Sequence, residues 1–376
     1  MGSDPINTLE FPTLYSEILN RIASIDPIKY GISRNYIDGA VSYLSPYISR
    51  GVVSTQFIMK SLIKKGYSLH TIEKFIQELA WRDYWQRVWQ VKQTEINTDL
   101  RQKQKPVRSQ KISSAILNAS TGIHAIDDAI HSFYSTGYLH NHIRMYIAAI
   151  SCNMGHNHWK HPAQWMYYYL LDADWGSNAL SWQWVAGTNS NKKYYANQEN
   201  INTYCQTNQK GTFLDIDYDA FQFFEAPKEL LPTEIFHLTT KLPEPDELVL
   251  SEQLPNFIYN AYNLDPLWQK DIEANRILLL EPSHFDAYPM AKKSIDFIIS
   301  LSKNIVGIQI YVGEFKDLQM KLNLGTIHYK EHPLNKHYKG IQTPREWMTS
   351  TEDYFSSFFK FWKQSKKEIL EFFPQE

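Results

Sequence analysis

The sequence is poor in cysteine and in long apolar runs, and each shortage excludes a class of protein. Its 376 residues include only two cysteines, Cys152 and Cys205. These are too few for a disulfide framework or for the usual cysteine ligands of an iron–sulfur cluster. No apolar run approaches the roughly 20 residues of a membrane-spanning helix, and no signal peptide opens the chain. We therefore expect a cytoplasmic protein that has no membrane segment.

Net charge is also small, because 38 Lys and Arg residues oppose 40 Asp and Glu residues and leave a formal charge of −2. This balance argues against a globally basic nucleic-acid binder. Residues 101–126 depart from it, since they contain no acidic residue but include Arg101, Lys103, Lys105, Arg108 and Lys111. Such a run is either a solvated loop or a local patch that contacts phosphates, and composition alone leaves both open.

The first half of the chain has a helical pattern that is rich in aromatic residues. Apolar residues recur every three or four positions over residues 71–91, without Pro or Gly, which predicts one long helix. The same pattern predicts helices at 123–135, 141–154 and 164–173. We therefore expect a mainly α fold, with a helical domain over residues 1–210.

The pattern changes twice further along the chain. Residues 211–274 are irregular, with scattered prolines and acidic clusters, and we expect a linker or wrapping segment there. Short apolar runs at 276–281, 308–313 and 326–332 alternate with helical signals, which predicts a small α/β domain over residues 275–376. No G-x-G-x-x-G or Walker sequence occurs in it, so no local motif marks a phosphate site.

Four residues of the helix predicted at 71–91 form one stripe. Glu78, Trp81, Trp85 and Trp89 follow one another at intervals of three, four and four residues, which places them on one helix face. A carboxylate in line with three indoles needs a partner or a function, because a charge beside apolar rings is expensive to bury. A surface carboxylate above an ordinary aromatic core is equally compatible with this pattern.

Two later segments add polar groups that suit a ligand. Asn141, Arg144 and Met145 share a helix face, although a polar helix start with a buried Met has the same pattern. Asp172 and Asp174 precede a turn of small residues, and no His or Cys lies beside them in a metal-ligand pattern. We therefore expect no metal there, because the two carboxylates suit a neutral hydrogen-bonding ligand better.

Four motifs, in this order, resemble the DNA photolyase and cryptochrome family over residues 30–200. They are SYLSPYISRG (42–51), QELAWRDYW (77–85), TGIHAIDDAIHSFYSTGYLHNHIRM (121–145) and LLDADWGSNALSWQWVAGT (170–188). The resemblance implies an all-helical domain that holds FAD in a folded, U-shaped form. It also implies an enzyme, a deoxyribodipyrimidine photolyase, that repairs cyclobutane pyrimidine dimers in UV-damaged DNA by light-driven electron transfer from reduced FAD.

The family's cofactor residues match positions of this chain one by one. The resemblance assigns the FAD phosphates and ribityl chain to Tyr30, Ser42, Leu44 and Ser45. It assigns the flavin ring to Arg82, Arg144, Asp172, Asp174 and Asn178. Arginine cations favour the anionic reduced flavin, and an amide at Asn178 can hydrogen-bond the ring without adding a charge.

The family's lesion pocket maps onto Glu78, Trp81, Asn141, Met145 and Trp184. By resemblance, Trp81 and Trp184 sandwich a flipped-out dimer, which cannot reach the flavin while stacked in a duplex. Glu78 and Asn141 then hydrogen-bond the thymine edges, and Glu78 shares a proton with the dimer during repair. Met145 stands where enzymes for the (6-4) photoproduct carry a histidine, so the resemblance favours the cyclobutane dimer.

Electron-transfer residues and DNA contacts follow from the same resemblance. Trp182 and Trp159 match two steps of the family's tryptophan chain for photoreduction of the flavin. The outer tryptophan of that chain is missing, and we expect a tyrosine such as Tyr167 or Tyr168 to replace it. Contacts with the DNA backbone are expected from Arg34, Lys103, Lys105, Arg108, Lys192 and Lys193.

The α/β segment departs from the family pattern, in which an α/β antenna domain precedes the helical domain. Here the α/β segment follows it, so we expect no antenna chromophore. We expect a monomer, and a preference for single-stranded DNA stays open. Two other functions remain open as well, a cryptochrome-like blue-light photoreceptor and a (6-4) or dual-lesion photolyase. The complete lesion pocket favours repair, because a receptor need not keep all of its residues.

Overall fold

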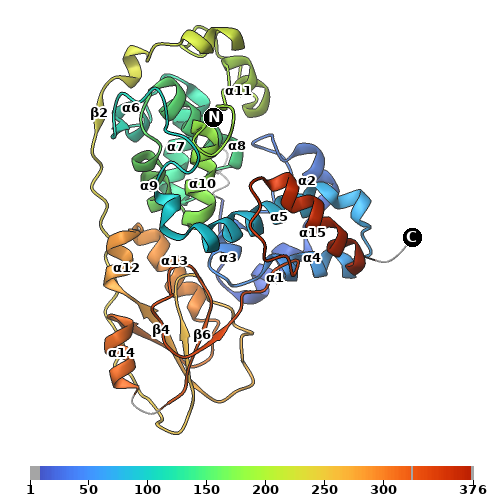
Figure 1. The fold of residues 1–376 in the computed structure, drawn as a ribbon, viewed down its shortest axis with the longest axis vertical. Coiled ribbons are helices and arrows are strands. Elements are labelled where there is room, and N and C mark those ends of the chain that lie inside the picture. Colours follow the sequence, from blue (N-terminus) through green and yellow to red (C-terminus); the bar gives the residue numbers. More distant parts are fainter. Residues whose placement is uncertain (1–8, 323–324, 374–376) are drawn as a thin grey trace, which may run out of the picture.

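The computed structural model describes residues 9–322 and 325–373, which form a helical part and an adjoining α/β part (Figure 1). The helices of the first part are α1 (Tyr15–Ala23), α2 (Pro27–Ser33), α3 (Ser45–Ser49), α4 (Thr55–Lys64), α5 (Leu69–Lys92), α6 (Ser114–Leu117), α7 (His124–Thr136), α8 (Asn141–Ala149), α9 (Lys160–Tyr169), α10 (Trp175–Ala186) and α11 (Gln198–Cys205). A 3-10 turn, η1 (Gln93–Asn97), follows α5, and a π-helical turn, η2 (Ile150–Met154), follows α8.

Helix α5 is the central element of the helical part and covers the whole stretch predicted at 71–91. From Asp83 to Trp89 every side chain is buried, as expected for a helix that is packed on all sides. It packs against α2, α4 and α10, and also against the last helix of the chain, α15 (Phe358–Phe372). Residues far apart in the sequence therefore meet on α5.

The segment from α8 to α10 differs from the prediction in a way that shapes the site. Helix α9 ends at Tyr169 rather than at residue 173, because Leu170 is extended and the Leu171 N–H donates to the Gly137 carbonyl at 2.9 Å. The carboxylate of Asp174 then caps α10 by accepting a hydrogen bond from the Ser177 N–H at 2.6 Å. Asp172 and Asp174 thus lie in the connection between α9 and α10, and Asp174 is the N-cap of α10 rather than part of the end of α9.

The α/β part contains a five-stranded parallel sheet with the strand order β5-β4-β3-β6-β7. Its strands are β3 (Asn256–Tyr259), β4 (Asn275–Leu280), β5 (Ile308–Val312), β6 (Ile327–Lys330) and β7 (Ile341–Thr343), with helices α12 (Pro282–Ala287), α13 (Lys292–Ser302) and α14 (Phe315–Lys321). The predicted apolar runs became β4, β5 and β6, whereas β3 lies in the segment expected to be a linker. The chain reverses direction across the sheet at β3, and such a crossover leaves a crevice at the carboxyl ends of β3 and β6.

The two parts share one apolar core. In β4, Leu278 and Leu280 belong to the cluster that runs through the helical part. The alternating residues Ile277 and Leu279 belong to a smaller cluster on the other face of the sheet. A parallel sheet buried on both faces is the usual arrangement, and here the helical part helps to cover one of these faces.

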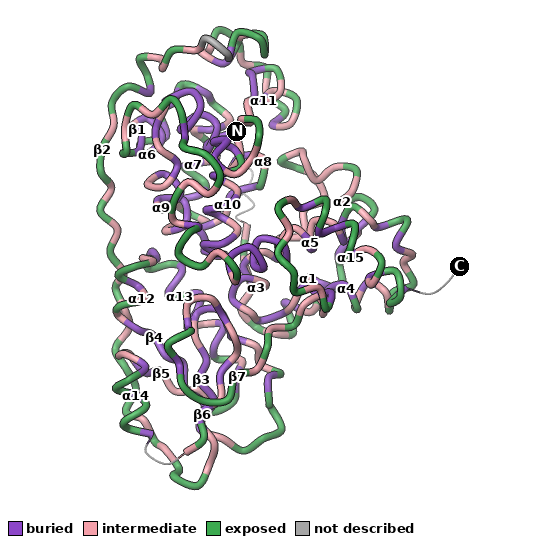
Figure 2. Tube along the Cα trace, in the orientation of Figure 1, coloured by how far each residue is buried: buried purple, intermediate pink, exposed green. Residues whose placement is uncertain are grey.

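A long extended segment joins the two parts. It runs along the outer edge of the molecule and is largely exposed (Figures 1 and 2). Short 3-10 turns, η3 (Tyr218–Phe223) and η4 (Lys228–Leu230), interrupt it. It is also held by a short antiparallel pair, β1 (Ile112–Ser113) with β2 (Thr233–Glu234). After the sheet, the chain returns to the helical part as α15, although the sequence pattern placed this stretch in the α/β domain. In the part of the chain that the structure describes, no helix is both long and apolar enough to cross a membrane.

Candidate cofactor and substrate site

A cavity of about 420 Å³ opens within the helical part, between α3, α5, α8 and α10. It brings together every residue that the sequence assigned to the cofactor and to the lesion, and also Trp182 of the expected electron-transfer chain. The assigned residues are Tyr30, Ser42, Leu44, Ser45, Glu78, Trp81, Arg82, Asn141, Arg144, Met145, Asp172, Asp174, Asn178 and Trp184. These residues are far apart in the sequence, and it is the fold that brings them together into one continuous lining.

Two arginine–aspartate pairs form the polar wall of the cavity. Arg144 Nη2 lies 2.9 Å from Asp172 Oδ2, and Arg82 is ion-paired with Asp174. Burial alone would raise the pKa of Asp174, but the Arg82 charge and hydrogen bonds from Arg82 and Ser177 outweigh it, so the pKa of Asp174 is lowered. Asp174 is therefore a carboxylate at neutral pH, and its charge holds Arg82 in place.

Two buried polar atoms of the lining have no hydrogen-bond partner among the described residues, Asp172 Oδ1 and Trp182 Nε1. Leaving such an atom unsatisfied costs about 1–3 kcal/mol. One is an acceptor and the other a donor. A polar ring system or polyol chain that enters the cavity can satisfy both, so this wall fits a ligand such as FAD.

Glu78 and its partner lie at another side of the cavity. Arg34 Nε is 3.3 Å from Glu78 Oε1. Arg34 therefore pairs with the carboxylate that the sequence assigned to the lesion, whereas the sequence assigned Arg34 itself to the DNA backbone. Burial raises the pKa of Glu78, and the charges of Arg34 and Lys74 only partly offset this rise. A carboxyl group with a raised pKa can hold a proton for transfer.

The two tryptophans that the sequence assigned to the lesion have different surroundings. Trp184 is 37% exposed. Trp81 is half-buried, and Phe358 of α15 stacks flat on it with ring centroids 3.7 Å apart and planes at 9°. On α8, Asn141 Nδ2 lies 3.8 Å from Met145 Sδ, so the predicted shared face of these two residues is present.

Two histidines flank Asn141, and both stay neutral at physiological pH. Burial and the neighbouring His142 lower the pKa of His140 to about 4. Burial also lowers the pKa of His142, with a further contribution from Arg34. His140 caps α8 by accepting a hydrogen bond from the His142 N–H at 3.2 Å. The Nδ1 atom of His140 is therefore already used in holding the start of α8.

The residues expected in electron transfer and in DNA contacts lie outside the cavity, apart from Trp182. Trp159 is buried, its Nε1–H donates to Asp99 Oδ1 at 2.7 Å, and its ring centroid is 6.4 Å from that of Trp175. Trp175 in turn has Tyr167 edge-on at 5.7 Å. Tyr168 lies elsewhere, and its hydroxyl donates to the Thr239 carbonyl.

The basic residues assigned to DNA fall into two groups. Lys103, Lys105 and Lys192 are exposed, and Lys193 is half-buried beside Gly187. Arg108 donates to the carbonyls of Leu230 and Leu231 at 3.1 and 3.0 Å. It therefore anchors the outer segment of the chain.

Sequence reasoning missed several lining residues, among them Ser177, Ser181, Phe75 and Leu79. A local signal existed for some of them. Ser181 follows Asn178 by three residues and Ser177 by four, so it shares their helix face. Leu79 and Phe75 lie one turn and almost two turns before Arg82 on α5, but nothing local distinguishes them from ordinary core residues.

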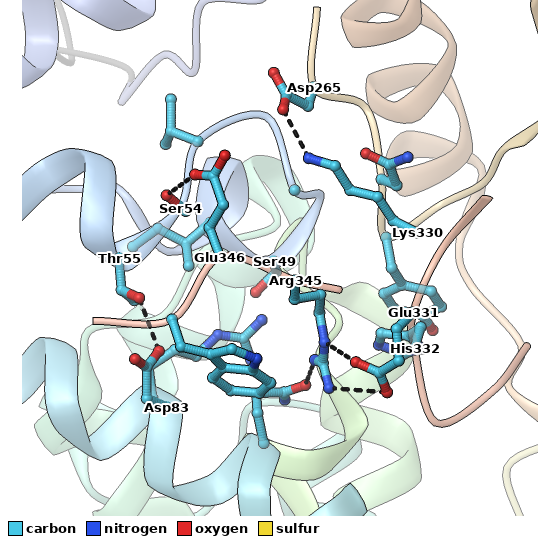
Figure 3. Close-up of a pocket in the computed structure, with 18 of the residues that line it drawn as sticks. Ser49, Ser54, Thr55, Asp83, Asp265, Lys330, Glu331, His332, Arg345 and Glu346 are labelled. Carbon is cyan, nitrogen blue, oxygen red and sulfur yellow. Dashed lines mark hydrogen bonds and ion pairs between the residues drawn. The ribbon is translucent and has the colours of Figure 1, made fainter. Parts of the chain in front are cut away.

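A second cavity, of about 90 Å³, lies between the helical part and the carboxyl ends of β3 and β6 (Figure 3). It shares the lining residues Ile48, Ser49 and Arg82 with the first cavity. Polar pairs line it, including Lys330 with Asp265 at 2.7 Å and Arg345 with Glu331 at 2.8 Å. Its volume lies below the roughly 300–1,000 Å³ typical of ligand pockets. We interpret it as a polar joint between the two parts.

Two side chains of this joint, Arg345 and Gln86, connect it to Asp174 in the wall of the first cavity. Arg345 Nη1 donates to Gln86 Oε1 at 2.6 Å, across 259 residues of sequence. Gln86 Nε2 then donates to both carboxylate oxygens of Asp174, at 3.0 and 2.9 Å. Asp174 is thereby tied to the segment that follows β7, and no sequence pattern pointed to this connection.

Residues 75–217 match the protein-family model described as the FAD binding domain of DNA photolyase. This segment is a photolyase-type FAD-binding domain. The cofactor of the family is FAD, and the arginine–aspartate pairs and unsatisfied polar atoms described above lie within the matched residues. The FAD-binding domain accounts for most of the cavity lining, and Tyr30, Ser42, Leu44 and Ser45 add to it from outside the matched segment.

Curated relatives of the FAD-binding domain include several deoxyribodipyrimidine photo-lyases. That of Streptomyces griseus is 31% identical over 155 residues, which cover 41% of this chain and 34% of the relative. That of Halobacterium salinarum is 23% identical over 222 residues, covering 56% and 45%. The chain thus spans between a third and a half of the length of these relatives.

Solved structures similar to this chain include the cryptochrome of Synechocystis, with 25% identity and a TM-score of 0.48 over 52% of this chain and 44% of that one. An archaeal photolyase from Sulfolobus tokodaii, solved with two FAD molecules, has 22% identity and a TM-score of 0.46 over 53% and 46%.

Proposed function

We propose that this chain is a light-dependent DNA repair enzyme that splits cyclobutane pyrimidine dimers with reduced FAD as electron donor. One observation carries the proposal: the residues suited to FAD and those suited to a flipped-out dimer line a single cavity. A donor and an acceptor bound in one cavity are close enough for direct electron transfer.

The residues of the cavity have distinct tasks in this function. A dimer must leave the duplex to enter, and weakened stacking at the lesion lowers the cost of extrusion. Trp81 and Trp184 then stack on it, which contributes roughly 1–3 kcal/mol per base. Asn141 donates to a thymine carbonyl, and Glu78, whose pKa is raised, holds a proton at the thymine edge.

FAD held in this cavity in its reduced form would, on illumination, supply one electron to the dimer and take it back once the two C–C bonds that join the thymines have broken, so that repair involves no net oxidation or reduction. Arg82 and Arg144 hold positive charge beside the cofactor, which favours its anionic reduced form. Asp172 and Asp174 keep both guanidinium groups oriented, and the buried surroundings of Asn178 exclude water from that side of the cavity.

The histidines beside Asn141 argue against a (6-4) photolyase. Chemistry that needs an imidazolium acid is not supported by His140, whose pKa is about 4, and Met145 replaces the second histidine. A flavin photoreceptor stays the second candidate, because two lesion groups already have partners inside the chain. Phe358 covers one face of Trp81, and Arg34 pairs with Glu78.

The experiment that tests the proposal is illumination of the reduced protein with dimer-containing oligothymidine, followed by the recovery of thymine absorbance. We expect the wild type to restore it, and Glu78→Ala to retain flavin while losing most of the repair yield. Trp81→Ala should mainly weaken binding of the damaged oligonucleotide. A wild type that binds FAD and leaves the dimer intact would reject repair in favour of the photoreceptor.

A further inference from the structure

Helix α15 packs against α5 (Figure 1), and its first residue, Phe358, contacts Trp81 of α5. Its contacts with α5 include the stacking of Phe358 on Trp81 and an ion pair between Lys366 Nζ and Glu73 Oε1 at 2.6 Å. Because Trp81 also lines the cavity, the first turn of α15 contacts a residue of the cavity lining.

The two faces of α15 differ sharply in chemistry. The inner face is apolar and buried, and comprises Phe358, Phe361, Trp362, Ser365 and Ile369. On the outer face, the exposed Lys360, Lys363 and Lys367 follow at intervals of three and four residues and form one row, which Glu371 continues. Among the residues that the structure describes, none of these three lysines makes an ion pair.

Phe359 stands at the end of this row that is nearest to the cavity. Its side chain is 67% exposed, and its ring lies edge-on to Trp81 with centroids 6.5 Å apart. A single exposed aromatic is ordinary on a protein surface. An exposed aromatic that touches a substrate-stacking tryptophan and leads into a row of cations is a combination suited to nucleic acid.

We propose that α15 binds the DNA strand that carries the dimer. Lys360, Lys363 and Lys367 contact successive phosphates beside the lesion, and Phe359 packs against the base next to the extruded dimer. This inference rests on the proposed repair function. Charge complementarity favours DNA as the partner. Neighbouring lysines of the row lie about 5–6 Å apart along one helix face, and a DNA strand carries a negatively charged phosphate at every nucleotide.

The salt dependence of binding tests the lysine row. Binding of a fluorescent dimer-containing oligothymidine by the FAD-loaded protein is measured by anisotropy over a range of salt concentrations. The triple variant Lys360→Gln, Lys363→Gln, Lys367→Gln should flatten the slope of log K against log salt by about 2, since each single-strand phosphate contact contributes about 0.7. The matched control is Lys303→Gln, Lys316→Gln, Lys321→Gln, which removes the same charge from exposed positions of the α/β part.

Phe359 is tested separately. Phe359→Ala should weaken binding about tenfold, whereas Phe359→Trp restores it and Phe372→Ala, at the far end of α15, leaves it unchanged. Repair per photon at saturating DNA should stay at the wild-type level in all these variants, because none of them removes a residue of the cavity lining. Flavin absorbance verifies that each variant is folded.

The possible outcomes separate this inference from the proposed function. If the wild type binds and repairs, but the two triple variants have equal salt slopes, then only the role of α15 is overturned. The lysine row is then a solvated face. A wild type that shows no binding to damaged or undamaged oligothymidine overturns both. A flattened slope only in the α15 variant, together with the Phe359→Ala loss, supports the inference.

Discussion

One residue of the cavity lining, Asp172, has one carboxylate oxygen with a hydrogen-bond partner among the described residues and one without. Asp172 uses Oδ2 to hold Arg144, while its Oδ1 has no partner within residues 9–322 and 325–373. The arginine therefore fixes the orientation of the carboxylate and leaves one oxygen for a ligand. This division of tasks explains why an aspartate at this position does more than balance charge.

Asp172→Ala should weaken FAD binding by about 10- to 100-fold, because hydrogen bonds to charged groups contribute about 1.5–3 kcal/mol and Arg144 loses its partner. Titration of the apoprotein with FAD, followed by flavin fluorescence, measures this. The control is Asp296→Ala, which removes an aspartate from an exposed pair with Lys292 and should leave affinity unchanged, since exposed pairs contribute little. Equal affinities for Asp172→Ala and the wild type would remove this residue from the site.

Glu78 predicts a pH dependence of repair. Its pKa is raised by burial, so the folded protein holds this proton more tightly than the unfolded chain does. The stabilising contribution of the protonated group is complete below its unfolded pKa and is lost as pH rises through the folded pKa. We expect the repair yield to fall over the same rise in pH, and Glu78→Gln, which cannot ionise, to show a flat profile. A falling profile that persists in Glu78→Gln would assign the titration to another group.

At the scale of elements, the segment after β7 acts on the FAD-binding domain from a distance in sequence. Its Arg345 completes a line of hydrogen bonds through Gln86 to Asp174, which holds Arg82. Helix α15 acts similarly through Phe358 and Trp81. Both contacts end on α5, which therefore transmits the position of the chain's last elements to the cavity.

Arg345→Met should lower FAD affinity about tenfold and shift the flavin absorption bands, because Gln86 loses its partner and Asp174 loses an oriented donor. Lys330→Met is the matched control, since Lys330 lines the same small cavity but pairs with Asp265. Arg345→Lys should restore affinity only in part, because an ammonium group cannot bond Gln86 and Glu331 with the fixed fork of a guanidinium. Absorption spectra and FAD titration of the three variants check this.

The elements differ in how far the sequence predicts them. Helix α5 was predictable because its apolar spacing persists for more than 20 residues without Pro or Gly. Strand β3 was not, because its four residues pair only with strands that come later in the chain, and a parallel pairing leaves no local turn signal. The cavity lining was predictable where motifs carried it, whereas Arg345 and Phe358 have no local signal because their partners lie far away in sequence.

At the scale of the whole molecule, the shared core predicts that both parts unfold together. Leu278→Ala removes a side chain from the core that continues into the helical part, and Ile277→Ala removes one from the opposite face of β4. Each should lower the free energy of unfolding by about 2–5 kcal/mol. In both variants, release of flavin and loss of far-UV circular dichroism should coincide in one thermal transition. Two separated transitions would show that the parts fold independently.

The return of α15 to α5 has a consequence for synthesis on the ribosome. Domains fold from the N-terminus as the chain emerges, so α5, α8 and α10 are released long before Phe358 and Arg345. Until Arg345 and Phe358 have emerged, the indole of Trp81 lacks its cover and Gln86 lacks its partner. The nascent helical part therefore waits without two contacts that support the cavity wall, and stable loading with FAD should follow the emergence of α15.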